Sequence, residues 1–308
     1  MADDFHEILA EIVEEVRPNL GEGKVASYIP ALAKADPMKF GMAITTINGD
    51  EFTVGDSEDR FTIQSISKVF TLTMALQQIG GELWDRVGRE PSGSAFNSLV
   101  QLEHEHGIPR NPLINAGAIV ITDVIVSQFK DGKPIDAIVK FLRDRTGSSD
   151  VEVDEEVATS ERDTGFRNAA MANFMRSFGN LHNDVDLVLD TYFRQCSMTV
   201  NARELSRAML FLANRGRDPV SGQEVVGAQR AKRINSLMLT CGHYDASGDF
   251  AFRVGLPGKS GVAGGIGAVV PRRLAIAVWS PGLNAQGNSF VGTLALEKFA
   301  AKTGFSVF

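Results

Sequence analysis

Apolar residues recur along this chain with two different periods. From Phe5 to Val16 an apolar residue falls at every third or fourth position with acidic residues between, which predicts an amphipathic helix that ends before Pro18. Residues 40–47 then form an apolar run typical of a strand. The turn signal Asn48-Gly49-Asp50 follows, so we expect a hairpin with its return strand at residues 52–54.

The middle of the chain has helical spacing. Helices are predicted at residues 69–79, 119–129, 135–145, 169–179, 185–193 and 202–213. Strand-like patterns return near the end of the chain, at residues 250–254, 262–270 and 274–279. A closing amphipathic helix is predicted at residues 290–299.

Strands at both ends of a chain with helices between them indicate an α+β fold. We expect an antiparallel sheet built from residues 1–64 and 228–308, flanked by the terminal helices, with an inserted all-helical domain at residues 65–227. Ligand sites favour domain boundaries, so an active site is expected at the junction of the two parts.

Composition narrows the class of protein. The 308 residues are 44% apolar and 22% charged, which suits a globular chain with a sizeable core. The net charge of −7 argues against nucleic acid and against an acidic membrane surface as partners. Two cysteines are too few for a disulfide-rich scaffold, the N-terminus lacks the apolar core of a signal peptide, and no apolar run is long enough to span a membrane. We therefore expect a soluble, cytoplasmic protein.

Candidate chemistry begins at Ser65, where a short apolar segment meets a predicted helix and Lys68 follows three residues later. Backbone N–H groups at a helix entrance have no intrahelical partner, so they can stabilise negative charge on a substrate oxygen. The Lys68 amine, one turn away, could activate the hydroxyl as a nucleophile. This S-x-x-K spacing is a signature of acyl-transfer enzymes. The alternative is a serine that caps the helix, with a lysine on the surface.

The same spacing occurs a second time, at Ser127 and Lys130. This copy closes an apolar helical stretch, so its serine has no free N–H groups in front of it. We expect a solvated helix end there.

A second motif lies near the C-terminus, at Lys259-Ser260-Gly261. S-x-x-K enzymes of the penicillin-recognising type carry K-T-G on a strand beside the nucleophile, and Ser260 keeps the hydroxyl. The Val262 N–H would then be a second oxyanion donor with that of Ser65. The alternative is a glycine-rich strand that packs against a helix. Lys259 could also lower the pKa of Lys68 by repulsion if the two amines are close.

The third element of such enzymes, S-D-N or Y-x-N, is absent, which weakens a β-lactamase assignment and leaves Tyr192 as a phenol partner for Ser65. Longer motifs favour a different family, because with them the chain resembles the serine-dependent glutaminases. The resemblance runs from Lys24 to Pro281 and is carried by Gln64-Ser65-Ile66-Ser67-Lys68, Asn111-Pro112-Leu113-Ile114-Asn115-Ala116-Gly117-Ala118, Ser160-Glu161-Arg162, Arg167-Asn168, Cys241-Gly242-His243-Tyr244-Asp245 and Gly255-Leu256-Pro257-Gly258-Lys259-Ser260-Gly261-Val262-Ala263-Gly264-Gly265.

The resemblance implies a β-lactamase-like fold and an amidohydrolase that converts L-glutamine to L-glutamate and ammonia, without a metal or a cofactor. It implies a homo-oligomer, a dimer or a tetramer, with a role in glutamine catabolism and glutamate biosynthesis. Ser65 would be the nucleophile, Lys68 its base and Tyr192 a further catalytic residue. The implied substrate-binding residues are Tyr28, Ser65, Asn115, Glu161, Asn168, Tyr192, Tyr244 and Val262.

The chemistry of these side chains suits glutamine. Glu161 can pair with the ammonium of the substrate, and the amides of Asn115 and Asn168 can donate to its carboxylate. Ser65 would form a glutamyl-enzyme ester that water then cleaves. Two other functions stay open: a β-lactamase or peptidase-like acyl-transferase of the same fold, and a module that senses glutamine without turning it over and so does not need Lys68.

Overall fold

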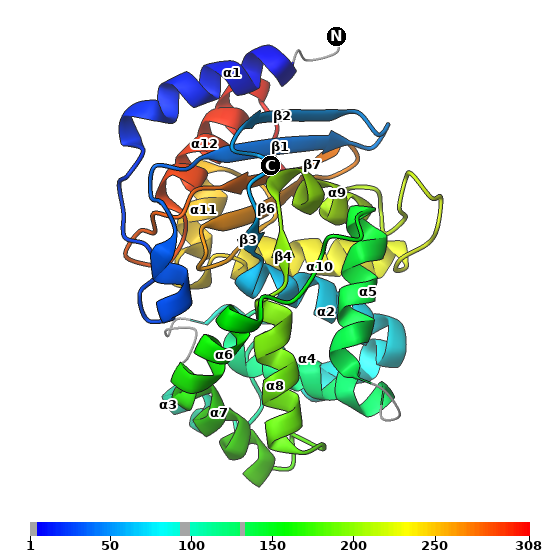
Figure 1. Cartoon of the computed structure of the whole chain (residues 1–308). Coiled ribbons are helices and arrows are strands. Elements are labelled where there is room, and N and C mark those ends of the chain that lie inside the picture. Colours follow the sequence, from blue (N-terminus) through cyan, green and yellow to red (C-terminus); the bar gives the residue numbers. More distant parts are fainter. Residues whose placement is uncertain (1–4, 93–98, 130–132) are drawn as a thin grey trace.

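The computed structural model describes residues 5–92, 99–129 and 133–308 of the chain (Figure 1). Its α-helices are α1 (Phe5–Val16), α2 (Ser67–Ile79), α3 (Leu99–His104), α4 (Asn115–Gln128), α5 (Pro134–Thr146), α6 (Glu155–Thr164), α7 (Phe166–Ser177), α8 (Val185–Cys196), α9 (Ala202–Ala213), α10 (Ala228–Cys241), α11 (Ser247–Arg253) and α12 (Phe290–Thr303). Its strands are β1 (Gly41–Thr46), β2 (Glu51–Gly55), β3 (Phe61–Thr62), β4 (Thr199–Val200), β5 (Gly258–Ser260), β6 (Gly265–Val270) and β7 (Leu274–Trp279). Short 3-10 turns include η3 (Gln64–Ile66) and η5 (Tyr244–Ala246).

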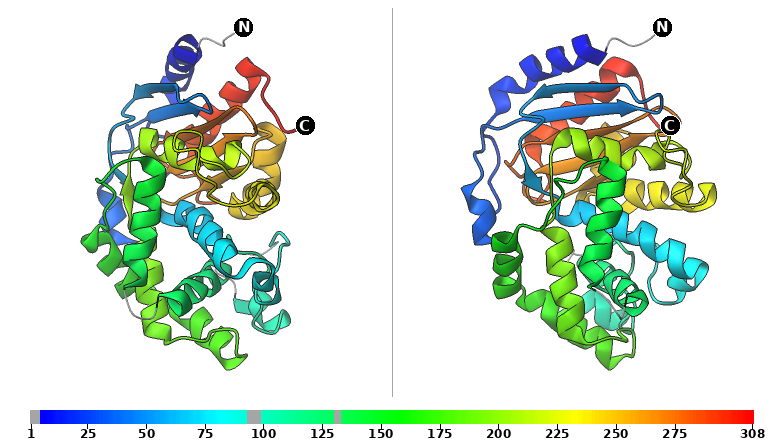
Figure 2. Two further views of the ribbon diagram at one scale, coloured as in Figure 1. Left: turned by 90° about the vertical axis from the view of Figure 1, so that its right-hand side faces the viewer. Right: turned by 45° about the vertical axis from the view of Figure 1, so that its right-hand side comes forward.

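Five of the strands form one sheet in the order β2-β1-β7-β6-β5, and every neighbouring pair in it is antiparallel. The strands come from both ends of the chain, because β1 and β2 precede the helical stretch and β5 to β7 follow it. Helices α1 and α12 cover one face of the sheet, while α9 lies against the other (Figures 1 and 2).

The two faces of the sheet carry side chains of different size. Along β7, Leu274, Ile276 and Val278 belong to the apolar core shared with α1 and α12. Ala275 and Ala277 alternate with them and join the core on the α9 side. Successive residues of a strand point to opposite faces, so this large-small alternation lets α9 pack close to the strand.

A second, two-stranded sheet links the main sheet to the helical region. Strand β3 pairs antiparallel with β4, with Phe61 opposite Val200. The chain therefore enters the helical region just after β3 and returns beside the same point. Helix α2 begins there, and ten of its residues are buried, from Ser67 to Leu76. Ser65 lies at this entrance, in η3.

Most of the predicted elements are present, and the α+β build with flanking terminal helices is confirmed. The strand predicted at residues 250–254 is wrong, because the structure has helix α11 there. Phe250 and Val254, four positions apart, are buried on one helical face, whereas Phe252 is 90% exposed. A five-residue apolar alternation does not separate a strand from a short helix.

The division of the chain at 64/65 and 227/228 stays a prediction. Helix α9, which falls inside the range assigned to the helical domain, packs against β1, β6 and β7. Within the described ranges, no helix has both the length and the apolar character that a membrane crossing needs.

Candidate active site

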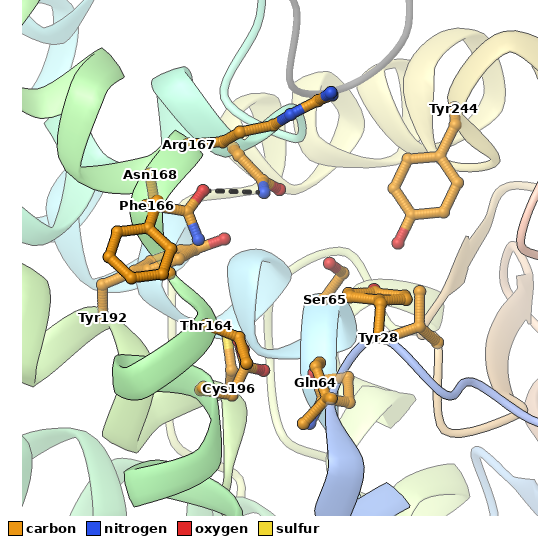
Figure 3. Close-up of a pocket in the computed structure, with 15 residues that line it drawn as sticks. Tyr28, Gln64, Ser65, Thr164, Phe166, Arg167, Asn168, Tyr192, Cys196 and Tyr244 are labelled. Carbon is orange, nitrogen blue, oxygen red and sulfur yellow. Dashed lines mark hydrogen bonds between the residues drawn. The ribbon is translucent and has the colours of Figure 1, made fainter. Parts of the chain in front are cut away.

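A cavity of about 480 Å³ opens where the helical region meets the sheet (Figure 3). It is lined by residues from α4, α6, α7, α8, η3 and η5, by the segment after β5, and by Tyr28 and Ile29. All eight predicted substrate-binding residues line it: Tyr28, Ser65, Asn115, Glu161, Asn168, Tyr192, Tyr244 and Val262. These residues are up to 234 positions apart in the chain, so the fold alone brings them together.

Ser65 stands on the short turn η3 at the floor of this cavity. The residues that cap η3 and α2 are Ile63 and Ile66, neither with a side-chain cap hydrogen bond, so Ser65 does not have the capping role of the alternative interpretation. Gln64, just before it, is buried with a left-handed φ of 49°. A non-glycine residue in this region stores about 1–3 kcal/mol and persists only where its surroundings fix it, which is common at active sites.

Lys68 follows Ser65 by one turn and is fully buried. Side chains three positions apart lie on the same side of a 3-10 or α-helical turn, which directs Lys68, in the first turn of α2, to the same side as Ser65. Its Nζ donates to Asn115 Oδ1 at 2.7 Å and to the Leu113 carbonyl at 3.4 Å. Burial lowers the pKa of Lys68 to about 8, against the opposing effects of Cys196 and Glu161. The amine is therefore partly neutral near pH 8 and can accept a proton.

Asn115 connects this amine to the opposite wall of the cavity. While its Oδ1 accepts from Lys68, its Nδ2 donates to Asn168 Oδ1 at 3.0 Å (Figure 3). Asn168 lies in the first turn of α7, next to Arg167. The pair fixes the orientation of both amides, and the remaining N–H groups of Asn115 and Asn168 can face a ligand carboxylate.

Glu161 supplies the acidic group of the cavity. It is on α6 and only 8% exposed. Burial raises its pKa to about 7, against Lys68 and a hydrogen bond from Gln64, which lower it. A cationic ligand in the cavity would favour the ionised form, because an opposite charge lowers the pKa of a carboxyl group. Glu161 is thus suited to recognise an ammonium.

The three tyrosines take different positions around the cavity. Tyr28 is 56% exposed and stands at the mouth. Tyr192 and Tyr244 are buried, and burial raises both of their pKa values, that of Tyr244 to about 12. The Tyr244 hydroxyl points toward Ser65 and interacts with that hydroxyl (Figure 3). Both buried phenols therefore keep their protons at neutral pH.

Val262 follows β5 and lines the same cavity as Ser65. Gly261, between them, touches the start of η3, because a Cβ at Gly261 would lie 2.8 Å from the Ile63 carbonyl oxygen. Among the residues that the structure describes, no backbone carbonyl accepts from the Val262 N–H. This N–H and that of Ser65 can serve as two donors to one substrate oxygen.

Lys259 does not reach the cavity. It is fully buried on β5, where burial and then the Lys68 charge lower its pKa well below the usual value. The two amines thus interact, but burial rather than Lys259 is the main cause of the low pKa of Lys68.

The sequence analysis gave no role to several residues that line the cavity, among them Gln64 and Cys196. Gln64, although quoted in the motif, was given no role, yet it interacts with Glu161. Cys196 lines the cavity, receives a hydrogen bond from Ser67 Oγ at 4.0 Å and interacts with Tyr192. Burial raises the pKa of Cys196 to about 12, so it is a neutral thiol. A lone cysteine in a sequence gives no signal of either contact.

Ser127, the serine of the second S-x-x-K motif, lies at the end of a helix and not at its entrance, as expected. The Ser127 hydroxyl donates to the Asp123 carbonyl in the last turns of α4 and accepts from Asn183. Lys130 lies outside the described residues. Within the described part of the chain, no three His, Cys, Asp or Glu side chains gather as metal ligands.

Comparisons with known proteins agree along the whole chain. The glutaminase family model matches residues 23–308. A glutaminase of Agrobacterium fabrum is 60% identical over 305 residues, which cover 99% of both chains. A thermolabile glutaminase of Rhizobium etli is 58% identical with the same coverage.

Solved structures give the same result for the fold. A probable glutaminase, ybaS, has a TM-score of 0.91 with 38% identity and 98% coverage of both chains. A probable glutaminase from Bacillus subtilis complexed with 6-diazo-5-oxo-L-norleucine has a TM-score of 0.88 with 32% identity, and covers 100% of this chain and 98% of its own.

Proposed function

The chain belongs to the glutaminase family and is an amidohydrolase, and we propose that it hydrolyses L-glutamine to L-glutamate and ammonia with Ser65 as the nucleophile. One observation carries this proposal: the Ser65 hydroxyl and the Glu161 carboxylate line a single cavity whose floor also hides a lysine amine with a pKa of about 8. The cavity combines an activated hydroxyl with an acid that suits an amino group.

The charged groups of glutamine, its ammonium and its carboxylate, set its orientation in the cavity. The ammonium of glutamine pairs with Glu161, and the carboxylate accepts hydrogen bonds from the amides of Asn115 and Asn168. The neutral side-chain amide then extends toward Ser65. The Bacillus subtilis relative complexed with 6-diazo-5-oxo-L-norleucine supports an amino-acid ligand for this cavity.

In the first half of the reaction, Lys68 takes the proton of the Ser65 hydroxyl while the Ser65 oxygen bonds to the amide carbon of the side chain. The electron pair of the carbonyl moves to its oxygen, which the N–H groups of Ser65 and Val262 stabilise. The carbonyl then re-forms and expels the nitrogen, which leaves as ammonia with a proton from Lys68. The Tyr192 phenol is the alternative donor of this proton.

In the second half, water attacks the glutamyl ester. Lys68 takes a proton from this water, and the tetrahedral intermediate uses the same two N–H donors. The Ser65 oxygen leaves, regains the proton and releases L-glutamate. A homo-oligomer of two or four copies stays a prediction from the sequence resemblance, and a cytoplasmic location stays a prediction from the composition.

Ammonia release from L-glutamine by the purified protein is the direct test. L-asparagine, one methylene shorter, and a chromogenic β-lactam serve as competing substrates. We expect turnover of glutamine and at most about 1% of that kcat/KM with asparagine, because the shorter side chain cannot reach Ser65 while its ammonium contacts Glu161. Turnover of the β-lactam alone would replace this function by the acyl-transferase alternative. Binding of glutamine without ammonia release would favour a sensing module.

The substitution Glu161→Gln should raise KM for glutamine by about 100-fold and lower kcat by less than about tenfold. The reason is that a charge-assisted pair with the ammonium, worth about 2–3 kcal/mol, is lost while Ser65 and Lys68 are unchanged. In the wild type, KM should also rise as the pH falls below 7, because Glu161 gains a proton there. The variant should lack this rise.

The matched control is Glu156→Gln on the same helix, since Glu156 is exposed and pairs with Lys34 on the surface. Its KM should equal that of the wild type. An unchanged KM for Glu161→Gln between pH 6 and 8 would show that Glu161 does not hold the ammonium.

A further inference from the structure

Lys259 makes contacts that the reaction described above does not use. Its Nζ donates to the Gly242 carbonyl at 2.8 Å and to the Ser260 carbonyl at 2.6 Å. The same nitrogen lies 4.3 Å from the centre of the Tyr244 ring. One amine thus touches the turn before Tyr244, the strand β5 and the ring of Tyr244 itself.

Tyr244 needs such support because its backbone is strained. Its φ is +58°, a left-handed conformation that is uncommon for a bulky residue. The turn that carries it is also pressed against β5, because a Cβ at Gly242 would lie 1.8 Å from the Gly258 carbonyl oxygen. The position of the Tyr244 hydroxyl beside Ser65 therefore depends on how residues 242–244 are held on the strand.

Polar groups fix this turn from several sides. The Asn288 amide donates to the His243 carbonyl at 3.3 Å, and its Oδ1 accepts from the Ser260 hydroxyl at 2.6 Å. The Ser247 hydroxyl accepts from the His243 N–H at 3.0 Å. The Ser260 hydroxyl also interacts with the Tyr244 hydroxyl, and Lys259 contacts the Tyr244 ring.

We infer that Lys259 is a positioning residue for the reaction: its amine clamps the Gly242–Tyr244 turn onto β5 and so holds the Tyr244 hydroxyl at Ser65. This inference rests on the proposed function of Ser65. Two N–H groups are enough for the two carbonyl acceptors, so the clamp works whether or not the amine carries a proton.

An electrostatic role is the competing explanation. The ionisable groups that face Lys259 are Lys68 on α2, Cys196 on α8, Cys241 on α10 and His243 beside Tyr244. If Lys259 served mainly to repel the charge of Lys68, its removal would raise the pKa of Lys68 and move the acid limb of the kcat profile to higher pH. If Lys259 acts as a clamp, its removal should lower the plateau of kcat and leave the acid limb at the same pH.

The test is a double-mutant cycle between Lys259→Met and Tyr244→Phe, measured as ammonia release at saturating glutamine. We expect each single variant to lower kcat by about 100-fold, because a misplaced or missing hydroxyl at the reacting centre costs that much. The double variant should stay within about threefold of Tyr244→Phe, because Lys259 acts through the hydroxyl that Tyr244→Phe has already removed. KM should change by less than about fivefold in every variant, since the group that holds the ammonium is untouched.

Lys298→Met on α12 is the matched control, because it removes a lysine that pairs with Glu15 on the surface. Its kcat should stay within about twofold of the wild type. Melting temperatures show whether Lys259→Met folds, and Lys259→Ala, which also removes the N–H donors, replaces it in the cycle if it does not.

Three results would overturn the inference. The first is a double variant whose loss of kcat equals the product of the two single losses. The others are a kcat for Lys259→Met within about threefold of the wild type and an acid limb that moves by about one pH unit or more in that variant. If the wild type itself released no ammonia, the proposed function would fail, and the clamp would be judged by a crystal structure of Lys259→Met. A Tyr244 φ that stays positive there, with the hydroxyl still at Ser65, would refute the clamp.

Discussion

Replacing Ser65 with alanine is expected to lower kcat for L-glutamine by at least about 10⁴-fold, while glutamine still binds. Removal of a nucleophile in a hydroxyl-based acyl-transfer site leaves only the contribution of binding and of the oxyanion donors. The backbone N–H groups of Ser65 and Val262 remain in the variant. Binding should therefore survive, because Glu161, Asn115 and Asn168 do not depend on the Ser65 hydroxyl.

Ammonia release measures the loss, and a rise in the melting temperature on addition of glutamine measures the remaining binding. Ser67→Ala is the matched control, since Ser67 is buried two residues further on, does not line the cavity, and donates its hydroxyl to the Cys196 sulfur. Its kcat should fall by less than about tenfold. A Ser65→Ala protein that keeps more than about 1% of the wild-type kcat would exclude Ser65 as the nucleophile.

A trapping experiment tests the proposed glutamyl ester. Hydroxylamine added during turnover should produce the hydroxamate of glutamate with the wild type and none with Ser65→Ala, because the ester forms only at that oxygen. Equal amounts from both proteins would mean that the acyl group is transferred without a bond to Ser65.

The spacing of residues along the chain predicted the helices and strands that carry the site better than it predicted which residues form the site. The hydrophobic pattern gave helix α2 and the hairpin of β1 and β2, and the S-x-x-K spacing identified the helix entrance at Ser65. These features depend on neighbouring residues, so a single sequence encodes them directly. The resemblance to a family was needed to gather residues from Tyr28 to Val262 around that entrance.

Other features depend on contacts across the chain, which spacing does not carry. The hydrogen bond from Lys68 to Asn115 joins residues 47 positions apart, and it ties the proposed base to an amide proposed to bind the substrate. The left-handed φ of Gln64 and Tyr244 is equally hidden, because neither is a glycine and neither sits in a turn signal. Such strain is visible only once the packing that enforces it is known.

Lys68 illustrates how a site can oppose stability. The protonated amine of a fully buried lysine is less stable than it would be in water. For that reason the pKa of Lys68 falls to about 8 from an ordinary 10.5. Below pH 8 the folded protein holds a buried ammonium at a cost of about 3 kcal/mol relative to the unfolded chain. Between pH 8 and 10.5 the unfolded chain binds more protons than the folded one, so this cost disappears as the pH rises.

The substitution Lys68→Met should therefore separate activity from stability. We expect kcat to fall by about 10³-fold or more, because the base that accepts the Ser65 proton is gone. We also expect a pH-dependent difference in melting temperature, variant minus wild type. This difference should be largest below pH 8 and decline steadily between pH 8 and 10.5. The lost hydrogen bonds to Asn115 and Leu113 reduce this advantage by a constant amount but do not change its dependence on pH.

Steady-state kinetics at pH 6 to 10 and thermal melts over the same range measure both effects. The acid limb of kcat near pH 8 in the wild type should be absent in Lys68→Met, since this limb reports the loss of a proton from the amine. Lys298→Met gives the effect of removing a lysine from the surface, and its difference from the wild type should be constant with pH. If the melting temperatures of Lys68→Met and the wild type ran parallel from pH 6 to 10, the buried amine would not have a lowered pKa, and Lys68 could not act as the base that this reaction needs.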